Sequence, residues 1–347
     1  MSVWRSALAA ALLVGVPTAP PANAAVDQPA PSRTLFTIAD EDVFESSGLV
    51  DDDRTVYTVN DSGDDAVVYG IDPGSGETVS RTTYADSVDD VEAVAPGAGG
   101  TVWVGDIGDN RERREDLTAF RVTPGRGDAQ RFTLGYPDGA RDAETLVVQP
   151  RTGRLFVVSK SAFGGTVYAA PPDLRTEGTN RLRAFARVAG LVTDGSFFPD
   201  GRHVVLRTYG TASVYAFPGF ELTGTVRLPA QRQGEGISVS PSGRVLVSSE
   251  GVHADVLEVT LPRTFTAAAA ATRPPGPEPS TRPPAHRPAR ATPAPRGPGD
   301  YVAIALVAGG LAFLGWLTLR NSRVQPPPRP AGRPRRSRGR RPPAGRR

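Results

Sequence analysis

Acidic side chains recur at five places in this 347-residue chain, each at the start of a short and largely apolar segment. A polar turn, a second apolar segment and a closing residue follow each time. The acids are separated by 47, 52, 50 and 41 residues and are Glu45, Glu92, Glu144, Asp194 and Glu235. The closing residues are Asp61, Asp106, Lys160, Arg207 and Glu250. Carboxylates brought together in such numbers can hold a hard divalent cation or share protons.

The repeat predicts an all-β fold, because two apolar segments joined by a polar turn form an antiparallel hairpin. A spacing of this length is typical of four-stranded propeller blades. Five repeats predict a five-bladed β-propeller, and a sixth blade hidden in the longer loops is the alternative. The third repeat is expected to end with a strand at residues 181–188.

The fifth repeat offers only three strands, at residues 236–240, 245–249 and 256–261. A separate apolar segment at residues 33–38 precedes the first repeat and can supply the missing strand. Such a closure joins the two ends of the ring and removes exposed sheet edges.

In each hairpin the start of the first strand lies beside the end of the second. The first strand of a propeller blade lines the central channel, so the recurring residues should converge on one mouth of that channel. This arrangement gathers eight acidic groups against Lys160 and Arg207. Asn60, Asp109 and Asn110, in the segments NDSG and GDIGDN, could add further oxygen atoms.

So many carboxylates cannot all stay charged at close range, so protonation, ion pairs or a bound cation must relieve the repulsion. We expect Ca²⁺, which accepts six to eight oxygen ligands, whereas a chain without cysteine and with three histidines gives little support for zinc or copper. Lys160 and Arg207 are the predicted catalytic residues, placed to stabilise developing negative charge. The expected metal ligands are Glu45, Asn60, Asp61, Glu92, Asp106, Glu144, Asp194, Glu235 and Glu250.

A purely structural role for these residues remains an alternative, because Asp, Asn and Glu at hairpin ends often accept bonds from nearby backbone N–H groups. His203 is expected inside a strand as a packed side chain. His253 follows Glu250 by three residues and could reach the same mouth. No nucleophile elbow, phosphate-binding loop or dinucleotide fingerprint occurs between a strand and a helix.

Composition divides the chain into five segments. Residues 1–24 resemble a signal peptide, with the apolar run 7–16 and an A-x-A pattern at residues 22–24; an uncleaved anchor helix is the alternative. Residues 25–262 form the expected propeller. Residues 263–299 contain 10 prolines and predict an extended stalk.

Residues 300–319 include 19 uncharged residues, enough for one transmembrane helix; a buried core helix is the alternative. Residues 320–347 hold 11 arginines and no acid, which by the positive-inside rule places them in the cytoplasm and the propeller outside the cell. The arginines suit orientation and attraction to anionic lipid better than nucleic-acid binding, since the body of the protein, residues 25–262, is acidic.

The segments ESSGL, NDSG, DVEAVA and GDIGDN, together with DAETLVV, TDGSFFPDG, GEGISVSPSG and SSEG, resemble secreted bacterial propellers with esterase-like or phytase-like labels. The resemblance covers about residues 33–261 and extends, more distantly, to gluconolactonase-like calcium propellers. It implies a divalent ion held near the channel, here by Glu45, Asn60, Asp61, Glu92, Asp106 and Glu235. The chain departs from this group in its five blades and in having Lys160 as its only lysine.

The sequence therefore predicts a membrane-anchored, monomeric extracellular propeller that binds Ca²⁺ and a polar small molecule. If it is an enzyme, metal-assisted hydrolysis of a phosphoester or a lactone is expected. The alternative is a non-enzymatic cell-surface module that recognises a protein or a glycan.

Overall fold

A computed structural model describes residues 26–61, 65–127 and 129–267 of the chain. The predicted signal peptide, most of the predicted stalk, the predicted membrane helix and the arginine-rich tail lie outside the described residues. Among the residues that are described, no helix is long and apolar enough to cross a membrane.

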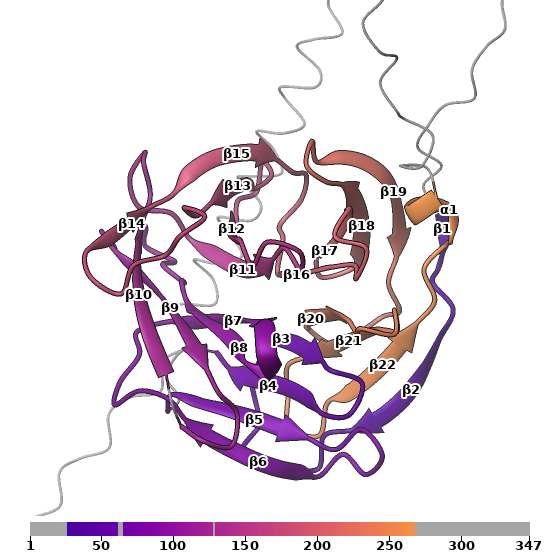
Figure 1. Ribbon diagram of the computed structural model, residues 1–347. Coiled ribbons are helices and arrows are strands. Elements are labelled where there is room, and N and C mark those ends of the chain that lie inside the picture. The colour runs from indigo at the N-terminus through magenta and orange to yellow at the C-terminus, as the bar shows by residue number, and fades with distance from the viewer. Residues whose placement is uncertain (1–25, 62–64, 128, 268–347) are drawn as a thin grey trace, which may run out of the picture. The chain divides into compact units, whose positions relative to one another are not determined.

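Five sheets, each built on four antiparallel strands, make up the described part of the chain, which confirms the all-β, five-bladed β-propeller and removes the six-bladed alternative. The innermost strands are those that begin each repeat, and Figure 1 shows them gathered around the centre of the ring. The first blade contains β3 (Ser46–Asp51), β4 (Val56–Asn60), β5 (Val67–Ile71) and β6 (Thr78–Thr83). The second contains β7 (Val91–Pro96), β8 (Val102–Asp106), β9 (Leu117–Val122) and β10 (Ala129–Gly135), with the 3₁₀ turn η1 (Ala98–Gly100) after β7.

The remaining three blades repeat this order from the centre outward. The third contains β11 (Ala143–Val148), β12 (Leu155–Ser159), β13 (Thr166–Ala169) and β15 (Arg183–Arg187). The fourth contains β16 (Asp194–Phe197), β17 (His203–Arg207), β18 (Thr211–Ala216) and β19 (Glu221–Arg227). The fifth contains β20 (Gly234–Val239), β21 (Val245–Ser249) and β22 (Asp255–Val259).

The ring closes through β2 (Ser32–Thr37), which pairs antiparallel with β22 and completes the fifth blade. This is the closure expected from the sequence. A further strand from the chain start, β1 (Val26–Pro29), runs parallel to β19 at the edge of the fourth blade. At the other end, the short helix α1 (Thr264–Ala267) packs Phe265 into the core between the fourth and fifth blades. The folded body therefore continues a few residues beyond Pro262.

One segment crosses between two blades. After β13 the chain leaves the third blade, forms β14 (Thr179–Arg181) in parallel pairing with β10 of the second blade, and then returns as β15. Asn180 anchors the crossing, because its amide donates to the carbonyls of Thr133 (3.0 Å) and Arg175 (2.8 Å). The strand predicted at residues 181–188 thus covers the return, β15, and only the last residue of the crossing strand β14.

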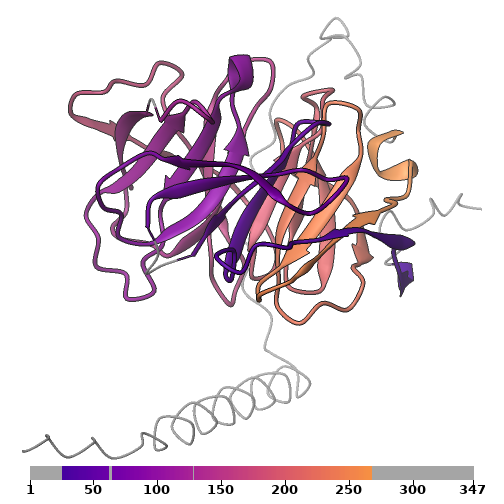
Figure 2. The same ribbon diagram turned by 90° about the horizontal axis from the view of Figure 1, so that it is seen from below.

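The hydrophobic core lies between the blades rather than around the axis. Five separate clusters of buried apolar residues each join two neighbouring blades, as expected for sheets that are apolar on both faces. Phe156 illustrates this packing, with its ring within 6.5 Å of those of Phe185, Phe197, Phe217 and Phe220. The view turned by 90° shows the strands crossing the thickness of the ring (Figure 2). The blades therefore form a rigid frame that fixes where each strand begins.

Candidate functional site

The innermost strands β3, β7, β11, β16 and β20 all begin at one face of the ring, which we call the start face. Their antiparallel partners end there, since Asp194 lies opposite Arg207 and Val91 opposite Asp106. Most of the recurring acids are therefore carried to this face by backbone geometry alone. The opposite face, where the innermost strands end, is called the end face.

Three carboxylates at the start face bring ligand oxygens within 4.8 Å of one another. They belong to Asp61, which follows β4, and to Asp90 and Glu92 at the start of β7, and we call them the three-carboxylate cluster. Gly108 makes room for two of them, since a Cβ atom there would lie 2.5 Å from Asp90 Oδ2 and 2.7 Å from Glu92 Oε1. Oxygen ligands at such separations suit a hard cation.

Glu92 has the most perturbed environment of the three. Its side chain is 4% exposed, and within the described part of the chain its carboxylate accepts no hydrogen bond. Burial, reinforced by the negative charges of Asp61 and Asp90, raises the pKa of Glu92 to about 9. A divalent cation would offset this shift, because its positive charge stabilises the ionised carboxylate.

Lys160, directly after β12, is one of the cations that the chain places at this face. Its ammonium donates to Glu144 Oε1 and to the Tyr209 hydroxyl at 3.3 Å, and it lies 5.7 Å from the centre of the Tyr209 ring. The second carboxylate oxygen of Glu144 is buried without a hydrogen-bond partner. The pKa of Tyr209 is raised to about 12, first by burial and then by Glu235 and Glu250. Lys160 and Tyr209 therefore face the acidic groups together.

Glu235 in β20 and Glu250 directly after β21 are two further acidic residues of the start face. Burial and then the charge of Glu250 raise the pKa of Glu235 to about 7, while Lys160 opposes the shift. The pKa of Glu250 is also raised, by burial and by Asp61, with Glu45 contributing. Glu235 is therefore able to take up and release a proton near neutral pH.

Arg207 and Asp194 lie beneath this face. Arg207 is fully buried, and its guanidinium donates to the carbonyls of Gly236 (2.7 Å) and Ser248 (3.1 Å). The Asp194 carboxylate accepts from the backbone N–H of Ile237 at 2.7 Å, and burial raises its pKa well above the usual value. Both side chains hydrogen-bond from the fourth blade to the backbone of the fifth. Arg207 is therefore buried and does not reach a ligand in this conformation.

Two other predicted ligands are held by the fold instead of joining the cluster. The Asp106 carboxylate accepts from the backbone N–H groups of Asp89 (3.2 Å) and Asp90 (3.0 Å) and pairs with Arg114 at 2.8 Å. The Asn60 amide donates to the Asp42 carbonyl at 2.7 Å, while its oxygen accepts from the Glu45 N–H at 3.3 Å. Asp106 nevertheless shapes the site, because it holds the segment that carries Asp90.

The remaining candidates have local partners. The Asp109 carboxylate accepts from the N–H groups of Arg113 and Arg114 in the loop after β8. His203 is buried in β17 beside Asp200 at 2.5 Å, as expected for a packed side chain. His253 Nδ1 lies 3.2 Å from the Ile38 carbonyl oxygen and its Nε2 lies 3.8 Å from Glu41 Oε1, so its recorded contacts do not include Asp61, Asp90 or Glu92.

Sequence reasoning missed Asp90, Asp142 and Tyr209. Asp90 and Asp142 each stand two residues before a recurring acid, directly ahead of β7 and β11, so both lie at the start face. The charge of Asp142 contributes to the raised pKa of Glu92, and its carboxylate accepts from the Asp109 N–H at 2.9 Å. Tyr209 follows the closing residue Arg207 by two. A search two residues to either side of each repeat position would have found all three.

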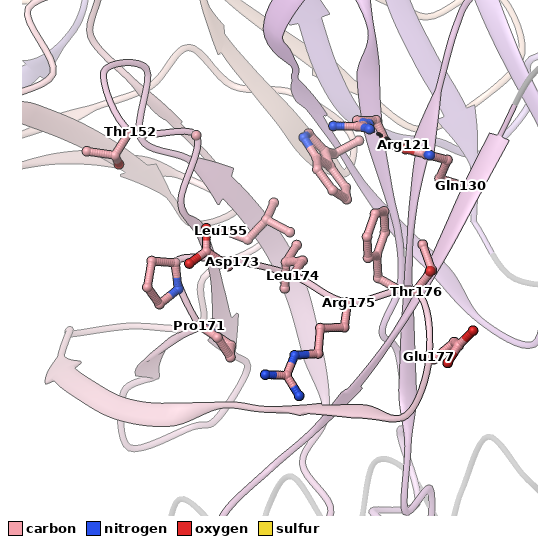
Figure 3. A pocket seen from close by; sticks show the side chains of 14 residues that line it. Arg121, Gln130, Thr152, Leu155, Pro171, Asp173, Leu174, Arg175, Thr176 and Glu177 are labelled. Carbon is pink, nitrogen blue, oxygen red and sulfur yellow. Dashed lines mark hydrogen bonds between the residues drawn. The ribbon is translucent and has the colours of Figure 1, made fainter.

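The largest recorded cavity is elsewhere. About 690 Å³ lies between the second blade and the crossing segment before β14, on the side of the end face, and is lined in part by Trp103, Phe132, Leu155 and Leu174. Figure 3 shows this cavity from close by. Arg121, Arg175 and Glu177 stand at its edge. A second cavity, of about 370 Å³, is lined by residues of all five blades where the innermost strands end, including Phe197 and Pro241. Neither cavity is lined by Asp61, Asp90, Glu92, Glu235 or Glu250.

Comparison with known proteins identifies similar folds and no family. The chain matches no protein-family profile, and no curated protein matches it. An aldose sugar dehydrogenase from Streptomyces coelicolor, solved with bound PQQ, aligns with 11% identity and a TM-score of 0.40 over 69% of this chain and 99% of its own. A gluconolactonase from Xanthomonas campestris aligns with 13% identity and a TM-score of 0.43, over 67% and 90% of the two chains. A chain of a nidogen–laminin complex aligns with 16% identity and a TM-score of 0.39, over 60% and 73%. Similarity at this level transfers no activity, so function must be argued from the site.

Proposed function

We propose that the start face binds Ca²⁺ at Asp61, Asp90 and Glu92 and that the protein hydrolyses a lactone or a phosphoester there. The observation that carries the proposal is the approach of three carboxylates to within 4.8 Å, one of them buried and without a hydrogen bond. Such a group is costly in the metal-free protein and favourable when a cation is bound.

The donor set favours calcium over other metals. All three side chains offer oxygen, the chain has no cysteine, and both histidines of the described segments are occupied elsewhere. Calcium accepts irregular sets of carboxylate, carbonyl and water oxygens, whereas magnesium demands a near-ideal octahedron. Carboxylates of this face outside the cluster, such as Glu45 and Glu250, add negative potential that attracts a cation.

A bound divalent cation would supply Lewis acidity for an ester or phosphoryl oxygen. The chain's own residues would do the rest. The Lys160 ammonium and the Tyr209 hydroxyl, 3.3 Å apart, would together hold an anionic oxygen of the substrate. Glu235, with a pKa near 7, would hold or move the proton that hydrolysis requires.

We further propose that this activity lies outside the cell, in a protein anchored by one membrane helix at residues 300–319. A signal peptide at residues 1–24 and the arginine-rich tail support this orientation. Extracellular calcium would then be available at concentrations that fill even a weak site.

Calorimetric titration of the purified, metal-free protein with CaCl₂ tests the metal site. We expect a saturable heat of Ca²⁺ binding that fits a single site, and a rise in the melting temperature of the protein when Ca²⁺ is added. The Ca²⁺-loaded protein should then hydrolyse members of a lactone and phosphoester panel, and Lys160→Ala should reduce turnover while leaving the calcium heat in place.

The panel also separates the two classes of function. Calcium binding without turnover on any substrate would favour the non-enzymatic binding module. Absence of both calcium heat and thermal stabilisation would remove the metal site itself.

A further inference from the structure

Large apolar side chains are exposed on the start face, around the acidic residues. The described part of the chain has seven exposed large hydrophobic residues, and five of them lie in loops at this face: Phe44, Phe163, Leu191, Tyr209 and Val252. The other two, Val79 and Leu222, lie on the outermost strands β6 and β19, near the end face. Such clustering differs from the scattered single exposures that are normal on a soluble surface.

Three of the five form one group, which we call the apolar rim: Phe163, Leu191 and Tyr209. The loop carrying Phe163 lies against residues 188 and 189, because a Cβ atom on Gly164 would lie 2.5 Å from the Val188 carbonyl oxygen. Residues 189–193 then run beside the end of β17, where the Thr193 N–H donates to the Arg207 carbonyl at 3.0 Å. Tyr209 follows, so the three side chains come from adjoining loops.

The apolar rim borders the charged groups directly. Tyr209 belongs to both, because its hydroxyl accepts from Lys160 while its ring is partly exposed. Phe163 follows Lys160 by three residues and is 77% exposed. A ligand whose anionic head is held by the cation, Lys160 and Tyr209 would therefore extend its body across this rim.

We propose that the ligand of this face is an amphiphile, with an anionic or ester head at the three-carboxylate cluster and an apolar chain lying against Phe163, Leu191 and Tyr209. This inference rests on the proposed function and narrows it, because a free sugar lactone or a multiply phosphorylated polyol has no apolar body. Burying the chain on the rim would remove apolar surface from water on both partners, which favours binding in proportion to chain length.

A series of alkylphosphonates tests this inference by calorimetry on the Ca²⁺-loaded full-length protein. Methyl-, butyl-, hexyl- and octylphosphonate share one head and differ only in apolar length. We expect affinity to rise by about fourfold per fully buried methylene, the value that hydrophobic transfer predicts. Phe163→Ser should flatten this dependence while leaving the affinity for methylphosphonate within about twofold of the unsubstituted protein, because the serine touches only the chain.

Val79→Ser is the matched control, since Val79 is 62% exposed but lies on β6, away from the start face. It should keep the full chain-length dependence. Equal affinity for all four phosphonates, or an unchanged dependence in Phe163→Ser, would overturn the inference while the calcium heat still supported the metal site. Loss of the calcium heat would overturn the proposed function and this inference together, so the two failures are distinguishable.

Discussion

Glu92 near the start of β7 and Asp106 at the end of β8 lie at the same end of one hairpin, yet their hydrogen-bond partners differ. Asp106 accepts two backbone N–H groups and pairs with Arg114, which stabilises its charge. Glu92 has no such partner and is surrounded by other acids. The negative charge on Glu92 is therefore what a cation would compensate, whereas the charge on Asp106 is already compensated by the protein.

Glu92→Gln should lower calcium affinity by more than about tenfold, because it removes a charged ligand from the three-carboxylate cluster. The same change should raise the melting temperature of the metal-free protein at pH 8, since Glu92, with a folded-state pKa of about 9, must take up a proton on folding at that pH and glutamine need not. Calorimetry and thermal unfolding in EDTA check both expectations. Glu258→Gln, on β22 where Glu258 pairs with Arg33, should change neither calcium affinity nor this melting temperature appreciably.

Lys160→Met should destabilise the protein by about 3 kcal/mol at pH 7, because it leaves the buried Glu144 carboxylate without its cation. Adding Glu144→Gln should recover most of that loss, as a neutral amide needs no counter-charge. Urea unfolding of the two single variants and the double variant gives the coupling energy. Additive effects of the two substitutions would show that the pair contributes nothing to stability.

At the scale of elements, the repeat in the sequence was sufficient to predict the hairpins, the blade number and the closure by residues 33–38. These features follow from alternation and spacing, which are local or periodic signals. The crossing segment with β14 was missed, because Thr179–Arg181 has only three residues in a polar context and gains its strand pairing from the neighbouring blade. A strand that short has no periodicity of its own.

The candidate site was predicted less completely than the blades. The repeat locates which residues reach the start face, but it does not say which of them meet backbone donors there. Asp106 and Asn60 bond to nearby backbone, and Arg207 is drawn beneath the surface by the carbonyls of Gly236 and Ser248. Those partners belong to loops and neighbouring blades, whose positions depend on tertiary packing.

Gly48→Ala should destabilise the fold by about 2 kcal/mol or more. Gly48 lies in β3 with φ +69°, and a Cβ atom there would lie 2.5 Å from the backbone nitrogen of Val94 in β7. The innermost strands of the first two blades therefore approach too closely for a side chain. Denaturant unfolding measures the loss, and Gly243→Ala is a control that separates the two causes. Gly243 also has a positive φ, but no atom lies within 4 Å of its Cβ position, so its loss should be smaller.

For the whole molecule, the free energy of unfolding in the absence of metal should decrease with rising pH, because acidic residues of the start face have raised pKa values. The pKa values of Glu92 and Glu235 are raised to about 9 and about 7 in the folded protein, above their ordinary value of 4.5. The folded state therefore holds more protons than the unfolded chain between these values, and the free energy of unfolding should fall as pH rises from about 5 to 9. In EDTA, the melting temperature should be lower at pH 9 than at pH 5.5.

Calcium should reverse much of this loss, because it binds the deprotonated carboxylates and its affinity grows as protons leave. Melting curves at several pH values, with EDTA or with millimolar CaCl₂, test the relation. The double variant Glu92→Gln/Glu235→Gln should show a flatter pH dependence in EDTA. A melting temperature that increases toward pH 9 in EDTA would contradict the proposed electrostatics of this face.

The pairing of β2 with β22 also constrains how the protein can be made. During synthesis β2 leaves the ribosome among the first strands, while its partner β22 emerges more than two hundred residues later. Until then, β2 and β21 each present an unpaired edge that invites association with other chains. A nascent chain halted before Asp255 would hold four complete blades and still lack a closed ring, so completion of the last blade is the step at which the molecule becomes protected from aggregation.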